Sequence, residues 1–198
     1  REGPGKAAHA TFELQERAQV LDVLDEKPIM VHIAVAEGER YPYEMLFRSI
    51  HRHLCDAATN EFAFCARFFS PPDGRTSFNN AFTKTLSATL EGLENHLFTS
   101  HDPVALLLLL RLTHMFRNQM KTRGVNVLDN FYDRIDMLIW PRVKAVVDNN
   151  VRSVRACVSS PKKLGPVDLH AHIVSRRYAE FTASVLTLLK GMDGADGE

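Results

Sequence analysis

The sequence predicts an all-α protein, built as an elongated antiparallel stack of about six helices. Apolar residues recur every three or four positions through most of the chain, and prolines, glycines and capping residues separate these segments. No pair of segments shows the alternating pattern of paired strands. With 198 residues, of which 45% are hydrophobic and 24% charged, the composition is that of an ordinary globular domain.

Residues at the ends of the predicted helices explain most of their boundaries. The fourth helix has the clearest start, with Asp102 as N-cap and Pro103 in the first turn, and it is expected to stop at Gly124. The second helix opens at Pro42 and ends before the SPPDG break at 70–74. The expected helices are 11–27, 42–69, 77–99, 103–123, 126–157 and 169–190.

The first predicted helix begins with Thr11 as a possible N-cap. The apolar stretch IMVHIAVA at 29–36 has no apparent partner strand, so we expect a packed connector. A single helical-rod segment is expected at 11–190, between disordered tails at 1–10 and 191–198. Because the chain does not begin with methionine, we expect it to be an internal piece of a longer protein.

Several side chains are assigned to the core by their place on an apolar stripe. Cys65 is expected to be a small buried thiol, about 15 Å from Cys55 and therefore beyond disulfide reach. Trp140 is expected to pack in the core, and Pro141 beside it is expected to kink the fifth helix.

The charge is balanced in total but not along the chain. Residues 1–102 carry 10 Lys/Arg against 15 Asp/Glu, and residues 103–190 carry 14 against 6. The balanced total disfavours a dedicated nucleic-acid binder, and the asymmetry predicts an acidic end and a basic end. The densest basic sites are Arg152, Arg155, Arg176 and Arg177. They form either a docking surface for an acidic partner or a solvated face that complements helix dipoles.

No motif predicts catalysis, a cofactor or a metal. The pairs His51/His53 and His170/His172 lie in or beside predicted helices, where residues two apart point in different directions. We therefore expect these histidines at helix ends or on surfaces rather than as metal ligands. Gly-rich phosphate loops and activated nucleophile motifs are also missing from the sequence, which disfavours an enzyme.

Three stretches carry a family resemblance: RYPYEMLFRSIHRHL at 40–54, a long stretch at 116–155, and HIVSRRYAEF at 172–181. The matching residues are Tyr41 to Ser49, Leu128 with Asp129, Trp140 to Arg142, Ser153 to Arg155, and Arg176 to Phe181. In this order and spacing, the chain resembles the vacuolar-protein-sorting subunit fifty-two (Sac-two) family of the Golgi-associated retrograde protein complex.

The resemblance implies a non-catalytic tethering subunit with the helical-rod fold, which captures endosome-derived vesicles at the trans-Golgi network and serves recycling endosomes in a sister complex. It implies sibling subunits, SNARE proteins and a Rab-type Golgi GTPase as partners, no cofactor, and peripheral attachment to the cytosolic face of Golgi and endosomal membranes. The alternative is a regulatory helical module that binds a small GTPase or a helical peptide without tethering. The signature at 116–155 favours the tether, since a generic module need not share it.

Overall fold

The computed structural model describes residues 12–22, 24, 29, 36, 38, 40–69, 73–159 and 169–190. This part of the chain contains helices and turns and no strand, which confirms the all-α prediction. Its elements are a short 3₁₀ helix η1 (Gln15–Ala18), α2 (Gln19–Asp22), α4 (Tyr43–Phe68), α5 (Asp73–Thr99), α6 (Pro103–Thr122), α7 (Asp129–Val158) and α8 (Ile173–Lys190).

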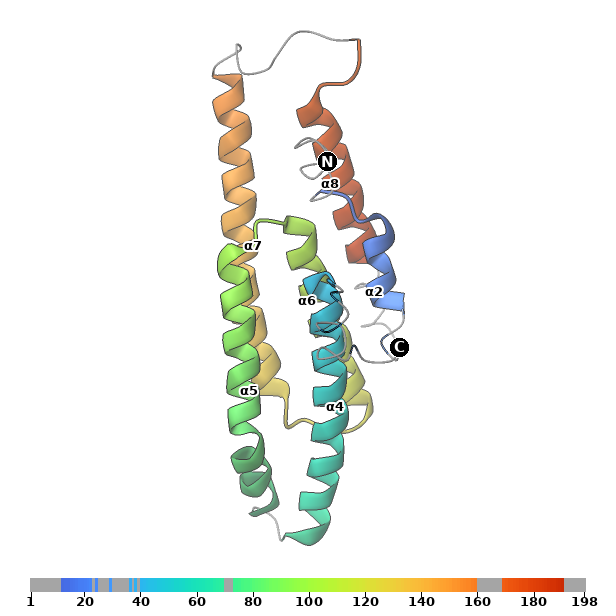
Figure 1. The fold of residues 1–198 in the computed structure, drawn as a ribbon, viewed down its shortest axis with the longest axis vertical. Coiled ribbons are helices and arrows are strands. Elements are labelled where there is room, and N and C mark those ends of the chain that lie inside the picture. Colours follow the sequence, from blue (N-terminus) through green and yellow to red (C-terminus); the bar gives the residue numbers. More distant parts are fainter. Residues whose placement is uncertain are drawn as a thin grey trace.

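The long helices run along the long axis of an elongated molecule (Figure 1). Helix α6 packs against α4, α7 and α8, while α5 packs against α4 and α7. Consecutive long helices reverse direction, so the predicted antiparallel stack is confirmed. Helix α7 continues beyond the end of α5, and the start of α8 lies at that same end of the molecule (Figure 1).

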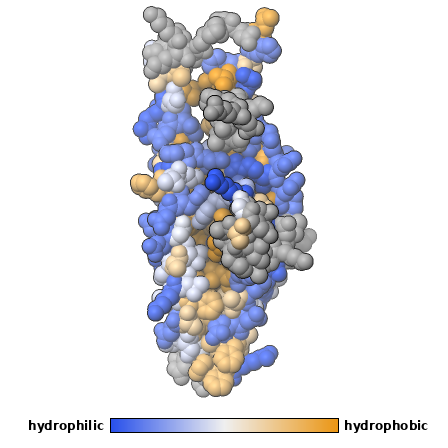
Figure 2. Space-filling view, viewed as in Figure 1, coloured by the Kyte–Doolittle hydropathy of each residue, from blue (hydrophilic) through white to orange (hydrophobic). Residues whose placement is uncertain are grey.

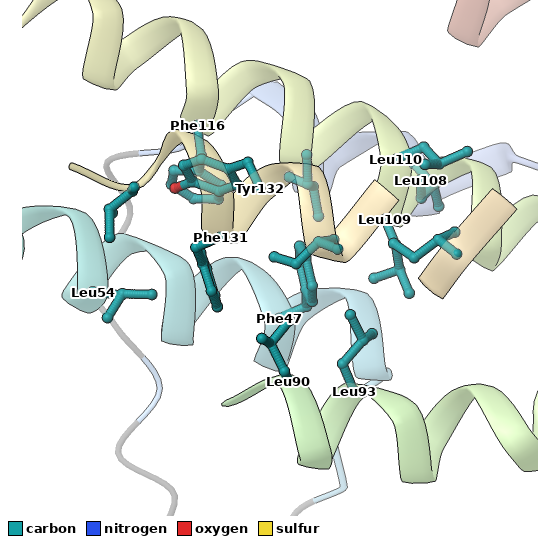
Figure 3. Close-up of a cluster of buried hydrophobic side chains, with 14 of the residues drawn as sticks. Phe47, Leu54, Leu90, Leu93, Leu108, Leu109, Leu110, Phe116, Phe131 and Tyr132 are labelled. Carbon is teal, nitrogen blue, oxygen red and sulfur yellow. The ribbon is translucent and has the colours of Figure 1, made fainter. Parts of the chain in front are cut away.

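The core lies where α4, α5, α6 and α7 meet, and most of α6 is buried in it (Figure 3). The central side chains include Phe47, Leu54, Leu90, Leu93, Leu108, Leu109, Phe116, Phe131 and Tyr132. The run of leucines in α6 is therefore a buried helix segment. Burial of each large apolar side chain contributes roughly 1.5–3 kcal/mol, which makes this layer the main source of stability.

Local capping sets both ends of α6 as the sequence predicts. The carboxylate of Asp102 accepts hydrogen bonds from the backbone N–H groups of Val104 and Ala105, at 3.0 and 2.9 Å. At the other end, Gly124 adopts a positive φ of 69°. The N–H of Gly124 donates to the carbonyl of Lys121, and the N–H of the next residue donates to the carbonyl of Met120. This is a Schellman motif, which favours glycine at the left-handed position.

The turn between α4 and α5 is shorter than predicted. Helix α5 begins at Asp73, four residues before the start expected near residue 77. Gly74 lies in the first turn of α5, and a Cβ atom there would approach the carbonyl oxygen of Cys65 to 2.9 Å. Only glycine allows the two helix ends to pack this closely.

The first predicted helix is also different in the structure. Residues 15–22 form η1 followed by one turn of α2, so a continuous helix over 11–27 was wrong. Arg17 of η1 forms ion pairs with Glu44 and Asp102, both within 2.9 Å. These ion pairs hold η1 and α2 against α4 and the start of α6.

Other parts of the predicted boundary pattern lie outside the described residues. Thr11 and the two tails, 1–10 and 191–198, belong there. Only the ends of the predicted connector at 29–36 are described, and the N–H of Ile29 donates to Ser49 Oγ at 2.9 Å. The single-segment arrangement and the tails stay predictions.

The charged halves of the sequence do not form two separate ends. Helices α4 and α5 from the acidic half pack alongside α6 and α7 from the basic half, so that prediction was wrong. Ion pairs join the halves, as between Arg123 and Asp56 at 2.9 Å. Antiparallel packing places segments from both halves at the same height of the stack.

Candidate protein-interaction surface

The four arginines singled out by the sequence lie on α7 and α8. Arg152 and Arg155 are exposed in the last two turns of α7, and Arg176 is exposed in the first turn of α8. Arg177 is half-buried, with its guanidinium carbon 5.7 Å from the centre of the Phe12 ring. This distance fits a cation–π contact, which gives Arg177 a role inside the chain as well.

These arginines occupy an end of the molecule that has little core. After Val146, none of the described side chains of α7 is buried, and in α8 the first buried residue is Ser184. Both helix segments lie at the same end of the stack (Figure 1). The structure therefore places the four arginines at the same end of the stack, two on α7 and two on α8.

Trp140 lies on the surface, so its assignment to the core was wrong. Its side chain is 56% exposed, and Met137, one turn earlier on α7, is 72% exposed. The core face of α7 is made by other residues, including Ile135 and Ile139. Pro141 is exposed within the continuous helix, and the predicted kink stays a prediction. Met137 was not predicted to be at the surface, although its position three residues before Trp140 places both on one face of the helix.

A second apolar surface lies at the opposite end of the stack, at the turn between α4 and α5. Phe64 and Phe68 stack with ring centres 5.5 Å apart, and Phe68 meets Phe69 edge to face at 5.0 Å. All three side chains are exposed. Figure 2 shows apolar side chains gathered at this end of the visible face. These side chains are exposed because α4 extends past α6 and α7 at this end of the stack (Figure 1).

A groove of 620 Å³ lies between α4 and α5. Tyr43 and His51 line it from α4, and Lys84, Thr85 and Thr89 line it from α5. His51 is buried, so the expectation that it lies at a helix end or on the surface was wrong, whereas His53 is exposed as expected. Burial lowers the pKa of His51 to about 4, which keeps the ring neutral at physiological pH.

The buried cysteines are structural groups. Cys65 is buried as predicted, and Cys55 Sγ lies 3.0 Å from Tyr132 Oη inside the core. Burial raises the pKa of the Cys55 thiol to about 11, so it is not a thiolate at neutral pH. Among the described residues, no group of three or more His, Cys, Asp or Glu side chains is placed to hold a metal ion.

A helical stack whose unusual features are exposed arginines and exposed apolar side chains is typical of proteins that bind other proteins. The sequence matches the family model described as Vps52, C-terminal, over residues 1–194. The chain therefore belongs to the Vps52 family.

Named relatives agree with this assignment. The chain is 36% identical over 195 residues to vacuolar protein sorting-associated protein 52 A of Arabidopsis thaliana, an alignment that covers 98% of this chain and 27% of the relative. It is 35% identical over 187 residues to the vacuolar protein sorting-associated protein 52 homolog of Homo sapiens, covering 92% of this chain and 26% of the relative. The chain thus spans about a quarter of the length of these curated relatives. No solved structure matches it significantly.

The printed names of these relatives refer to vacuolar protein sorting. In the part of the chain that the structure describes, none of the helices combines the length and hydrophobicity of a membrane span.

Proposed function

We propose that the chain belongs to a non-catalytic subunit of a multisubunit tethering complex that captures endosome-derived vesicles at the trans-Golgi network. The observation that carries this proposal is membership in the Vps52 family, whose relatives are named for vacuolar protein sorting. The elongated stack of helices supports it, because a rod presents long side faces and two ends to other proteins. Its exposed aromatic and arginine side chains are types enriched where proteins bind each other.

The partners proposed are sibling subunits of the complex, SNARE proteins and a Rab-type Golgi GTPase, without cofactor or nucleic acid. The site of action is the cytosolic face of the trans-Golgi network and endosomes, through peripheral attachment, and a second role at recycling endosomes belongs to the same proposal.

The docking surface proposed for an acidic partner is formed by Arg152, Arg155, Arg176 and Arg177. Arginine suits such a surface because its planar guanidinium pairs with carboxylates through two parallel hydrogen bonds. Arg152 and Arg155 are the better test positions, because both are exposed while Arg177 packs on Phe12.

Affinity purification of the full-length protein tests the function. Wild-type protein should recover its sibling subunits, and Arg152→Glu with Arg155→Glu should recover at least one partner less well, most clearly at low salt. Arg67→Glu with Arg75→Glu makes the same charge change at exposed positions near the opposite end and should leave recovery unchanged. Recovery of a GTPase or helical peptide without any sibling subunit would contradict the tether and favour the regulatory module.

A further inference from the structure

Helix α7 carries a second apolar stripe besides the one that faces the core. The stripe consists of residues spaced alternately three and four apart: Met137, Trp140, Lys144, Val147, Val151 and Val154. We call this set the α7 seam. Its spacing is that of the a and d positions of a heptad repeat, in which one helix packs along another.

Apart from Val147, which packs against the edge of the core, the side chains of the α7 seam point to the surface. Met137, Trp140, Val151 and Val154 are exposed large apolar side chains, Lys144 is exposed, and Val147 is half-buried. The buried face of the same helix includes Tyr132, Ile135, Ile139, Val143 and Val146. At about 100° per residue, the centres of the two stripes lie roughly a third of a turn apart. A surface helix needs only the inner stripe for its own fold.

The outer half of α7 also extends beyond its neighbour. Arg142 Nε donates to the carbonyl of Ser100 at 2.8 Å, which places Arg142 beside the end of α5. The following turns of α7 continue past that level (Figure 1). From residue 147 to residue 157, none of the side chains is buried. A helix segment of this length is marginally stable in water unless it packs against something.

The seam and its borders define the chemistry of an occupant. A heptad of apolar residues is complementary to another amphipathic helix, because knobs from one helix fit between side chains of the other. Lys144 lies within the seam and Arg155 lies beside it, against one exposed carboxylate at Asp148, while Arg152 lies farther round the helix. The acidic residues nearer the start of α7 are already paired, because Arg117 of α6 forms ion pairs with Asp133 and Asp136. The upper seam therefore favours acidic side chains on the incoming helix.

We propose that the α7 seam is the docking site for an amphipathic helix of another polypeptide, with apolar residues at its a and d positions and glutamate or aspartate beside them. A second copy of this chain fits less well, because two seams facing each other would bring Lys144 and Arg155 against a surface of the same sign. The inference rests on the proposed function only in that a sibling subunit would supply the helix.

Synthetic helices test the seam directly. The probes are two peptides about three heptads long with identical leucines at a and d, one with glutamate and one with lysine at the flanking positions. Trp140 is the only tryptophan in the chain, so its fluorescence reports seam occupancy without a label. The glutamate peptide should shift the emission to shorter wavelength and bind at least about tenfold more tightly than the lysine peptide.

Variants distinguish binding at the α7 seam from nonspecific hydrophobic binding. Met137→Glu with Val151→Glu should weaken binding of the glutamate peptide by about tenfold or more, whereas Phe98→Glu, at an exposed apolar site on α5, should not. Lys144→Glu should reverse the order of the two peptides. Equal binding of both peptides, absence of a Trp140 shift, or wild-type binding by the double variant overturns the proposal. If the wild-type chain is a dimer and the double variant is a monomer, the α7 seam binds a second copy of this chain, and the proposal is overturned.

The same substitutions in the full-length protein distinguish this inference from the proposed function. If the seam variant loses one sibling subunit while wild type keeps it, both stand. If the glutamate peptide binds the seam but the full-length wild-type protein recovers no sibling subunit, the seam stands and the tethering function fails. If siblings are recovered equally by wild type and seam variant and neither peptide shifts Trp140, the seam fails and the tether stands.

Discussion

The hydroxyl of Ser184 on α8 accepts a hydrogen bond from the backbone N–H of Leu14, at 3.0 Å, although the two residues are 170 positions apart in the sequence. Ser184 Oγ also lies 3.1 Å from the carbonyl of Phe12, whose ring meets Phe181 edge to face at 6.2 Å. The first described residues are therefore attached to the last helix. This contact joins the N-terminal segment to the second half of α8, where burial on α8 begins.

We expect Ser184→Ala to lower the free energy of unfolding by about 1–3 kcal/mol, because it leaves the buried N–H of Leu14 without its partner. Thr187→Ala is the matched control, since Thr187 is exposed and bonds only within its own helix. Chemical denaturation measures both. An equal, small effect of the two substitutions would show that the contact does not hold the segment.

A second prediction concerns pH and His51. Its Nδ1–H donates to the carbonyl of Phe47 at 2.9 Å, and its ring stacks on the Phe47 ring at 3.8 Å. Its Nε2 atom has no hydrogen-bond partner among the described residues. Burial lowers the pKa to about 4 from an ordinary value of 6.5, an effect that the bond to Phe47 only partly offsets.

Between pH 6.5 and pH 4 the unfolded chain binds a proton at His51 that the folded chain does not. Stability should therefore fall as the pH falls through this window, with a contribution from His51 of at most about 3 kcal/mol. His51→Phe should flatten the profile relative to wild type, whereas His53→Gln at an exposed site should not. Parallel wild-type and His51→Phe profiles would contradict the assignment.

The third prediction separates two roles of Asp102. Its carboxylate caps α6 and also pairs with Arg17. Asp102→Asn keeps an acceptor for the cap and should cost less than Asp102→Ala, which should cost about 1–2 kcal/mol for the cap alone. Thermal melts of the two variants measure the difference. Equal losses would assign the whole effect to the ion pair.

The fourth prediction concerns Pro141. Proline within a helix removes a backbone donor, and the exposed ring of Pro141 contributes little packing. Pro141→Ala should therefore stabilise the isolated chain, by about 1–3 kcal/mol. Gly92→Ala, at an exposed glycine with open space around it in α5, is a comparison for helix propensity alone. Lower stability of Pro141→Ala would show that a bend at this site is needed for packing.

The features that local chemistry decides could be predicted from the sequence. Asp102 and Gly124 act within a few residues, so residue type and spacing suffice to predict both ends of α6. The start of α5 was misplaced because the close approach of Gly74 to Cys65 depends on the partner helix.

Burial in the fifth helix was harder to predict. Trp140 belongs to one of two apolar stripes on α7, and a sequence with two stripes does not say which one faces the core. His51 is different, because four positions after Phe47 it lies on the buried face of α4. The spacing of His51 from Phe47 could have predicted its burial, but an ionisable side chain is usually expected at the surface. The ion pairs of Arg17 join segments that are distant in the sequence, so no local sequence pattern predicts them.

A transport assay can test the proposal that this chain serves vesicle capture. Cells depleted of the full-length protein should fail to deliver an endosome-derived membrane cargo to the trans-Golgi network, and wild-type protein should restore its arrival. The variant with Arg152→Glu, Arg155→Glu, Met137→Glu and Val151→Glu, expressed at the same level, should restore it less well. Undiminished arrival of the cargo in depleted cells would show that vesicle capture does not need this protein.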